Sequence, residues 1–165
     1  MSKGTVGEPP RPHTDLPLGA TGLRHHVQVR LRYADPIDAS HAVPRVIEVE
    51  VGAETDLIEI LAAVRLQPPG QRGHPSVDLE RGDGSCLTVG YAGELAYLRW
   101  IDSLGASYHS GAADDARELL VFDYFGSWTE IPKGCCIPAA DATAAALSYF
   151  CSGRPEHDRV LLEPD

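Results

Sequence analysis

The sequence predicts an α+β protein, with a mostly antiparallel sheet of about six to eight strands and two principal helices packed on it. Two observations support this. Segments with the two-residue alternation of strands outnumber those with helical spacing. In the middle of the chain several such segments also follow one another without a helix between them. A doubly wound parallel sheet would instead place a helix between each pair of strands.

The length and composition predict a single domain with an ordinary core. The chain has 165 residues, of which 43% are hydrophobic. Residues 1–24 contain several prolines and glycines and show no periodicity, so we expect a disordered leader there. Residues 25–165 form the predicted domain.

The charge excludes some classes of protein. Twenty-four acidic against fourteen basic residues give a formal net charge of −10, which opposes sequence-independent binding to nucleic acid. No run of residues reaches the ~18–20 apolar residues of a membrane span, and the first residues lack the apolar core of a signal peptide. We expect a cytoplasmic protein that is a monomer or weak homodimer, with reduced thiols at its four cysteines.

The first ordered segments read as a hairpin followed by a helix. Val27, Val29, Leu31 and Tyr33 alternate with polar residues, and a second alternation covers residues 47–51. Arginines on the first segment complement Glu48 and Glu50 on the second, which favours antiparallel pairing and makes these glutamates exposed strand charges. Thr55 is the expected N-cap of a helix. Its buried stripe is predicted to be Leu57, Ile60, Leu61 and Val64.

The middle of the chain reads as a meander of strands. Residues 77–80 and 86–89 are predicted to pair across a turn with two glycines, Gly82 and Gly84. Further strands are expected over residues 95–102 and 107–110. Gly82-Asp83-Gly84 lies between the predicted strands over residues 77–80 and 86–89 and is interpreted as a turn. It is not interpreted as a nucleotide-binding motif, because no helix follows whose N-terminus could bind a phosphate.

The densest apolar stretch is Arg117–Phe150. Most of residues 119–125 are apolar or aromatic on both faces, which is typical of a central strand. A helix is predicted to begin at Ile137-Pro138 and to stop at Gly153. Its expected buried stripe is Ala140, Ala144, Leu147 and Cys151, with Asp141 on the opposite, polar face. A short last strand is expected near Val160.

The sequence carries weak signals for catalysis. Cys135-Cys136 lacks the spacing of a metal clamp and has no histidine nearby in sequence, so we expect no metal, no cofactor and no enzymatic activity. One alternative remains open: a small-ligand protein or a cysteine-dependent enzyme with a pocket between sheet and helices. Its reactive groups would be Cys135 or Cys136 with His109.

Aromatic residues next to carboxylates suggest a protein interface instead. The hypothesis places its centre on residues 124–130 and on the turn at residues 102–108. The candidate partner-binding residues are Asp102, Tyr108, Asp123, Tyr124, Trp128 and Glu130.

Several motifs resemble those of immunity protein family one of bacterial polymorphic toxin systems. They are Leu87-Thr88-Val89-Gly90, Trp128-Thr129-Glu130-Ile131-Pro132, Ile137-Pro138 and the end of the alanine-rich helix at residues 150–155. The resemblance spans residues 75–163 and is strongest over residues 128–155. It implies a small cytoplasmic α+β protein that binds and neutralises a cognate toxin, often one with a deaminase or nuclease-like domain.

The charge and the resemblance point to the same kind of work. A toxin that acts on nucleic acid tends to carry a basic active-site face, and an acidic inhibitor would be steered to it electrostatically. The expected partner is therefore a basic toxin, whose active site is occluded. A third hypothesis is an accessory domain with a regulatory partner.

Overall fold

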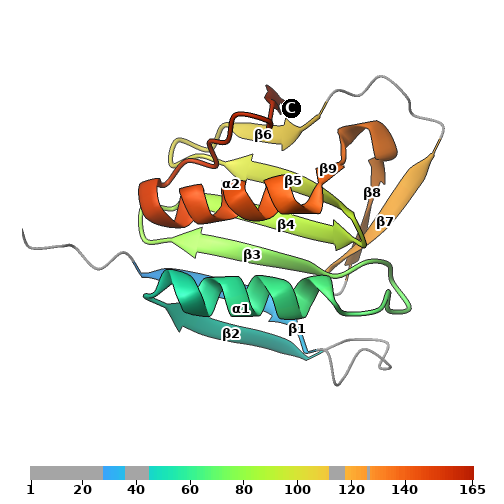
Figure 1. Cartoon of the computed structure of the whole chain (residues 1–165), viewed down its shortest axis with the longest axis horizontal. Helices are drawn as coiled ribbons and strands as arrows, with labels where there is room; N and C mark the ends of the chain where they lie inside the picture. Colours follow the sequence, from blue (N-terminus) through green and yellow to red (C-terminus); the bar gives the residue numbers. More distant parts are fainter. Residues whose placement is uncertain (1–27, 36–44, 112–117, 126) are drawn as a thin grey trace, which may run out of the picture.

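The computed structural model describes residues 28–35, 45–111, 118–125 and 127–165 (Figure 1). The predicted leader, residues 1–24, lies outside these residues. Two helices and a large antiparallel sheet make up the described fold, which confirms the predicted α+β class.

The main sheet has eight strands in the order β10-β6-β5-β4-β3-β1-β2, with β9 paired to β5. Every pairing within it is antiparallel. The strands are β1 Val29–Ala34, β2 Val46–Val51, β3 Ser76–Arg81, β4 Cys86–Ala92, β5 Leu95–Ile101, β6 Ser107–Ser110, β9 Ile137–Pro138 and β10 Leu162–Pro164.

The two predicted hairpins are confirmed. β1 pairs with β2 so that Arg30 faces Glu50 and Arg32 faces Glu48. β3 pairs with β4 across a turn in which Gly84 has a φ of 85°, a conformation that favours glycine. The other predicted turn glycine, Gly82, has no such positive φ.

Both helices cover the same face of the sheet (Figure 1). α1, Glu54–Arg65, buries three of the four predicted residues, Leu57, Leu61 and Val64, and the fourth, Ile60, is partly buried. Its N-cap is Ala53, not Thr55, and no side chain caps the helix. The expected Thr55 cap was wrong by two residues, because the chain already turns into the helix directly after β2.

α2, Ala139–Ser152, ends as expected at Gly153, whose φ is 83°. It begins after β9, so Ile137-Pro138 is strand and Pro138 is the N-cap. The predicted buried stripe was wrong. The residues that α2 buries are Ala139, Asp141, Ala142, Ala145, Ala146, Tyr149 and Phe150. Asp141 therefore points to the covered side of the helix and Cys151 is exposed.

The main core lies between the helices and the sheet. Alternate residues of the strands, such as Leu31, Leu79 and Leu87, are fully buried there together with α1 and α2. Each such leucine contributes ~1.5–3 kcal/mol by leaving water. The intervening strand residues point to the other face of the sheet, because side chains alternate along a strand.

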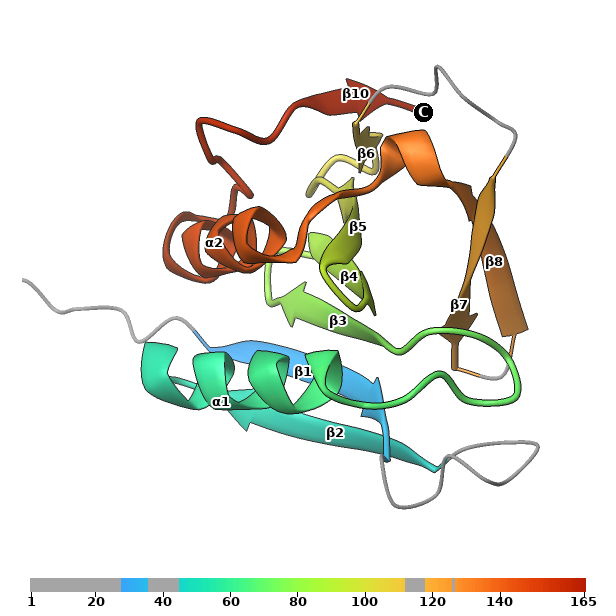
Figure 2. The same cartoon turned by 45° about the vertical axis from the view of Figure 1, so that its right-hand side comes forward.

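The predicted central strand is not in the main sheet. Residues 119–124 form β7, Leu119–Tyr124, which pairs with β8, Ser127–Pro132, as a separate antiparallel hairpin. Figure 2 shows this hairpin on the side of the sheet opposite the helices. Both faces of β7 are largely apolar because one packs on the sheet and Val121 on the other lies against Gly73.

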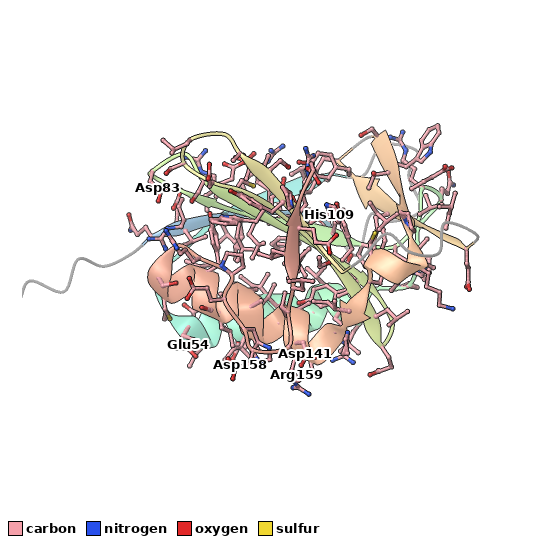
Figure 3. All side chains as sticks on the ribbon, turned by 90° about the horizontal axis from the view of Figure 1, so that it is seen from above. Glu54, Asp83, His109, Asp141, Asp158 and Arg159 are labelled. Carbon is pink, nitrogen blue, oxygen red and sulfur yellow. The ribbon has the colours of Figure 1, made fainter. Side chains whose placement is uncertain are left out.

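An ion pair ties the last described segment to α2. The Arg159 guanidinium lies 2.6 Å from Oδ1 of Asp141, which is 3% exposed. Figure 3 labels both residues beside the first turn of α2. The pairing explains why a carboxylate is tolerated on the buried side of this helix. The contact is an ion pair and not a hydrogen bond, because Oδ1 of Asp141 has no hydrogen-bond partner among the described residues.

Candidate partner-binding site

The face of the main sheet that points away from α1 and α2 is polar, and we call it the helix-free face. Its residues are Arg30, Arg32, Glu48, Glu50, Asp78, Glu80, Cys86, Thr88, Gly90, Tyr97, Arg99 and His109, which alternate with the core residues of the same strands. Cross-strand register aligns several of them in one row across the sheet, from Glu48 on β2 to His109 on β6.

Ion pairs connect the β1–β2 half of this face. Arg30 Nε lies 3.1 Å from Glu50, and Arg32 Nε lies 3.2 Å from Glu48. Arg32 also reaches Glu80 at 3.4 Å. Exposed pairs of this kind contribute ~0–1 kcal/mol each to stability. Their larger effect is on the electrostatic character of the surface.

Asp78 lies buried in the middle of the face and is 2% exposed. Its Oδ1 accepts a hydrogen bond from the Thr88 hydroxyl at 2.6 Å. Burial raises the pKa of Asp78 to about 6, although the hydroxyls of Thr88 and Tyr124 and the charge of Arg32 act in the opposite direction. At neutral pH this position therefore adds a largely ionised carboxylate to the floor of the face.

The β7–β8 hairpin closes over one end of the helix-free face. Its anchor is Phe122, which is 1% exposed and packs against Gly90, Tyr97 and His74. Backbone hydrogen bonds join β7 to the segment before β3, from His74 N–H to the Val121 carbonyl at 2.7 Å and from Asp123 N–H to the His74 carbonyl at 2.8 Å. The Ser76 hydroxyl also donates to the Asp123 carbonyl.

The end of β7 reaches across to β1. The Arg32 guanidinium lies 4.9 Å from the centre of the Phe125 ring, a cation–π arrangement. Phe125 has a φ of 47°, and its ring lies 5.3 Å from that of Tyr124. The hairpin and the Arg/Glu pairs of β1–β2 are therefore parts of one continuous surface.

A pocket of about 270 Å³ opens between the hairpin and the helix-free face. Its floor comes from β3, β4 and β5, and its wall comes from the hairpin. The lining residues are Ser76, Thr88, Gly90, Tyr97, Arg99, Phe122, Tyr124, Ser127, Trp128, Thr129 and Asp165. Asp165 lies 2.8 Å from His109 Nδ1 and 3.7 Å from Arg99, and it holds this side of the pocket together.

Four of the six predicted partner-binding residues belong to the hairpin. Tyr124 is 37% exposed, Trp128 is 64% exposed, and both line the pocket. Glu130 is exposed, and it shares the outward face of the hairpin with Asp123 and Trp128 by strand alternation. Asp123 is only partly exposed, with its Oδ1 buried and without a hydrogen-bond partner.

The other two predicted residues lie elsewhere. Asp102 holds the β5–β6 turn, where its Oδ1 accepts hydrogen bonds from the backbone N–H groups of Leu104 and Ala106 at 2.9 Å. Tyr108 stacks on Trp100 at 5.0 Å, on the helix side of the sheet. In Figure 1 this turn is at the left and the hairpin at the right, so the structure does not bring the two groups together.

The site also contains residues that the sequence interpretation did not assign to it. Asp78, Thr88, Arg99 and Asp165 come from four different segments, and strand alternation alone places the first three on polar faces. Only the register between strands shows that they are neighbours.

The cysteines have a different environment from that of a nucleophile. All four cysteines lie within the described residues, and none of them forms a disulfide there. Burial raises the pKa of Cys86 to about 12 and that of Cys136 to about 11, so both thiols stay protonated at neutral pH. His109 is engaged by Asp165, and the pocket lining contains neither Cys135 nor Cys136.

Neither a metal site nor a membrane span is found in the part of the chain that the structure describes. It contains no group of three or more His, Cys, Asp or Glu side chains arranged to hold a metal ion. Its helices are also too short and too polar for one of them to span a membrane.

Comparison with known proteins identifies a family. Residues 38–160, more than half of the chain, match the family model described as immunity protein Imm1. This range includes the whole β7–β8 hairpin and most of the helix-free face. No curated protein matches the chain.

Proposed function

The chain belongs to the immunity protein Imm1 family, and we propose that it binds its toxin through the helix-free face and the β7–β8 hairpin. The toxin's active site is then covered, and inhibition is steric. The observation that carries this proposal is Trp128, which is 64% exposed at the mouth of the pocket. A large aromatic side chain beside a pocket is the usual form of an interface anchor.

Charge supports a basic partner. The chain has a formal net charge of −10, and acidic residues outnumber arginines on the helix-free face. An excess of negative charge speeds the approach of a basic protein and acts mainly on the association rate. We therefore propose a toxin that acts on nucleic acid, of the deaminase or nuclease type, neutralised in the cytoplasm.

The raised pKa values of Cys86 and Cys136 keep these thiols protonated, which favours a binding function over a cysteine-dependent enzyme. An inhibitor that works by occlusion must be present in at least equal amount to the toxin, whereas an enzyme inactivates many toxin molecules per molecule. Stoichiometry therefore separates the two classes directly.

The test uses the protein encoded beside this gene as the candidate toxin. The two proteins are co-expressed and purified, and toxin activity is titrated with the purified chain. We expect one fixed-ratio complex, inhibition that is complete only at that ratio, and an unchanged toxin mass. Inhibition at a small fraction of that ratio, or a modified toxin, would establish an enzymatic function instead.

A further inference from the structure

We infer that the pocket between the β7–β8 hairpin and the sheet binds one arginine side chain of the toxin. This inference rests on the proposed function and specifies the chemistry of the contact at its centre. Its volume of about 270 Å³ lies just below the ~300–1,000 Å³ of pockets for drug-sized ligands. It therefore matches a single long side chain better than a complete small molecule.

The walls of the pocket suit a planar cation. Four aromatic residues, Tyr97, Phe122, Tyr124 and Trp128, line it. A guanidinium stacks on aromatic faces and is more weakly hydrated than an ammonium, so it loses less on entering such a site. Trp128 lies at the exposed rim of this lining, on the outward face of the hairpin.

The pocket also offers acceptors for the five N–H donors of a guanidinium. Tyr97 is 9% exposed, and its hydroxyl makes no hydrogen bond with any residue that the structure describes. Thr129 and Ser127 contribute further oxygen atoms to the same lining. A donor from a partner would satisfy the Tyr97 hydroxyl, which otherwise depends on water.

The local charge has a negative surplus. Asp165 lines the pocket, Asp78 lies beneath Thr88, and the charges of Arg32 and Glu80 act on Asp78, so three carboxylates stand against two arginines, Arg32 and Arg99. Arg99 lies 3.7 Å from Asp165, which neutralises it in part. The approach of a further cation is therefore favoured by the one surplus carboxylate, and an anion would have to displace the Arg99–Asp165 pair.

The test is an NMR titration of the purified full chain with N-acetyl-arginine methylamide. The neutral citrulline analogue, which has nearly the same shape, and the glutamate analogue are titrated in parallel. The reporters are the Gly90 backbone amide and the Trp128 indole N–H. We expect saturable shifts at both reporters in the millimolar range with the arginine probe, and binding of the citrulline probe about tenfold weaker.

Two variants locate the binding. Trp128→Ala should weaken arginine binding several-fold, whereas Leu66→Ala, at an 83% exposed leucine that caps α1, should leave it unchanged. Equal binding of the citrulline probe, stronger binding of the glutamate probe, or no shift at these reporters up to about 50 mM would overturn the inference. Failure of the neighbouring protein to form a complex, with arginine binding intact, would overturn the proposed function alone.

Discussion

Phe122 of β7 lies against Gly90 of β4 at a distance that leaves no space for a side chain. A Cβ added at Gly90 would lie 2.5 Å from the Phe122 ring. This contact fixes the height of the β7–β8 hairpin above the sheet, and so the width of the pocket.

Gly90→Ala should therefore destabilise the protein by about 1–3 kcal/mol, the usual cost of overpacking. Gly52→Ala is the matched control, because nothing lies within 4 Å of a Cβ there. Urea unfolding measures both variants. Equal stability of Gly90→Ala and the control would show that the hairpin does not rest on this contact.

The buried carboxylate of Asp78 predicts a pH dependence. Its folded-state pKa of about 6 exceeds the ordinary 3.8, so the folded state holds the proton more tightly than the unfolded chain. The contribution of Asp78 to the free energy of unfolding is therefore greatest below pH 4. It is lost as the pH rises from about 4 to about 6, with a total on the order of 3 kcal/mol.

Asp78→Asn removes this titration and keeps an acceptor for the Thr88 hydroxyl. We expect the variant to lack this decline between pH 4 and 6 and to be more stable than the wild type at pH 7.5. Thermal unfolding across this pH range measures the difference. The same pH profile in both proteins would contradict the role of Asp78.

The Asp141–Arg159 pair predicts an effect on stability at a distance from the binding surface. Arg159→Gln leaves a buried carboxylate without its charge partner. Arg159 itself is 72% exposed, so we expect a loss of about 1–3 kcal/mol, below the ~3–5 kcal/mol of a fully buried pair.

The control is Arg154→Gln, which removes an exposed arginine 3.7 Å from Glu156 and should change stability by less than about 0.5 kcal/mol. Adding Asp141→Asn to Arg159→Gln should recover part of the loss. Equal stability of the two arginine variants would assign the 2.6 Å contact no energetic role.

Much of the fold could be predicted from local patterns. The β1–β2 pairing was predictable because two alternating strands carried complementary charges on one face. The buried face of α2 was not, because a helix made mostly of alanine offers little difference in side-chain size between its faces. Contacts with the sheet decide the orientation, and they bury Asp141 with an ion-pair partner beyond the helix.

The site was predictable in part. The aromatic and acidic residues of the hairpin lie close together in the sequence, so Trp128 and Glu130 could be recognised together. Both faces of β7 carry apolar residues, as a central strand does, because Val121 on one face packs against Gly73 and Phe122 on the other packs against Gly90. The floor of the pocket depends on register between distant strands, which local patterns do not contain.

Glu130 tests the proposed electrostatic steering. Glu130→Lys should slow association with the toxin and weaken its dependence on salt, because the change removes an attractive exposed charge. Glu59→Lys, an exposed position on α1, makes the same charge change on the helix side. Stopped-flow association at low and high salt compares them. Equal slowing by both variants would indicate an effect of net charge alone.

The most direct test of the proposed binding surface is the dissociation rate of the toxin complex of Trp128→Ala. Because Trp128 is 64% exposed, its removal should leave the fold intact, which circular dichroism checks. We expect dissociation at least about 30-fold faster than in the wild type, as for an interface hot spot of ~2 kcal/mol. Leu66→Ala on the helix side should dissociate at the wild-type rate. A wild-type rate for Trp128→Ala would contradict binding through the hairpin and the helix-free face.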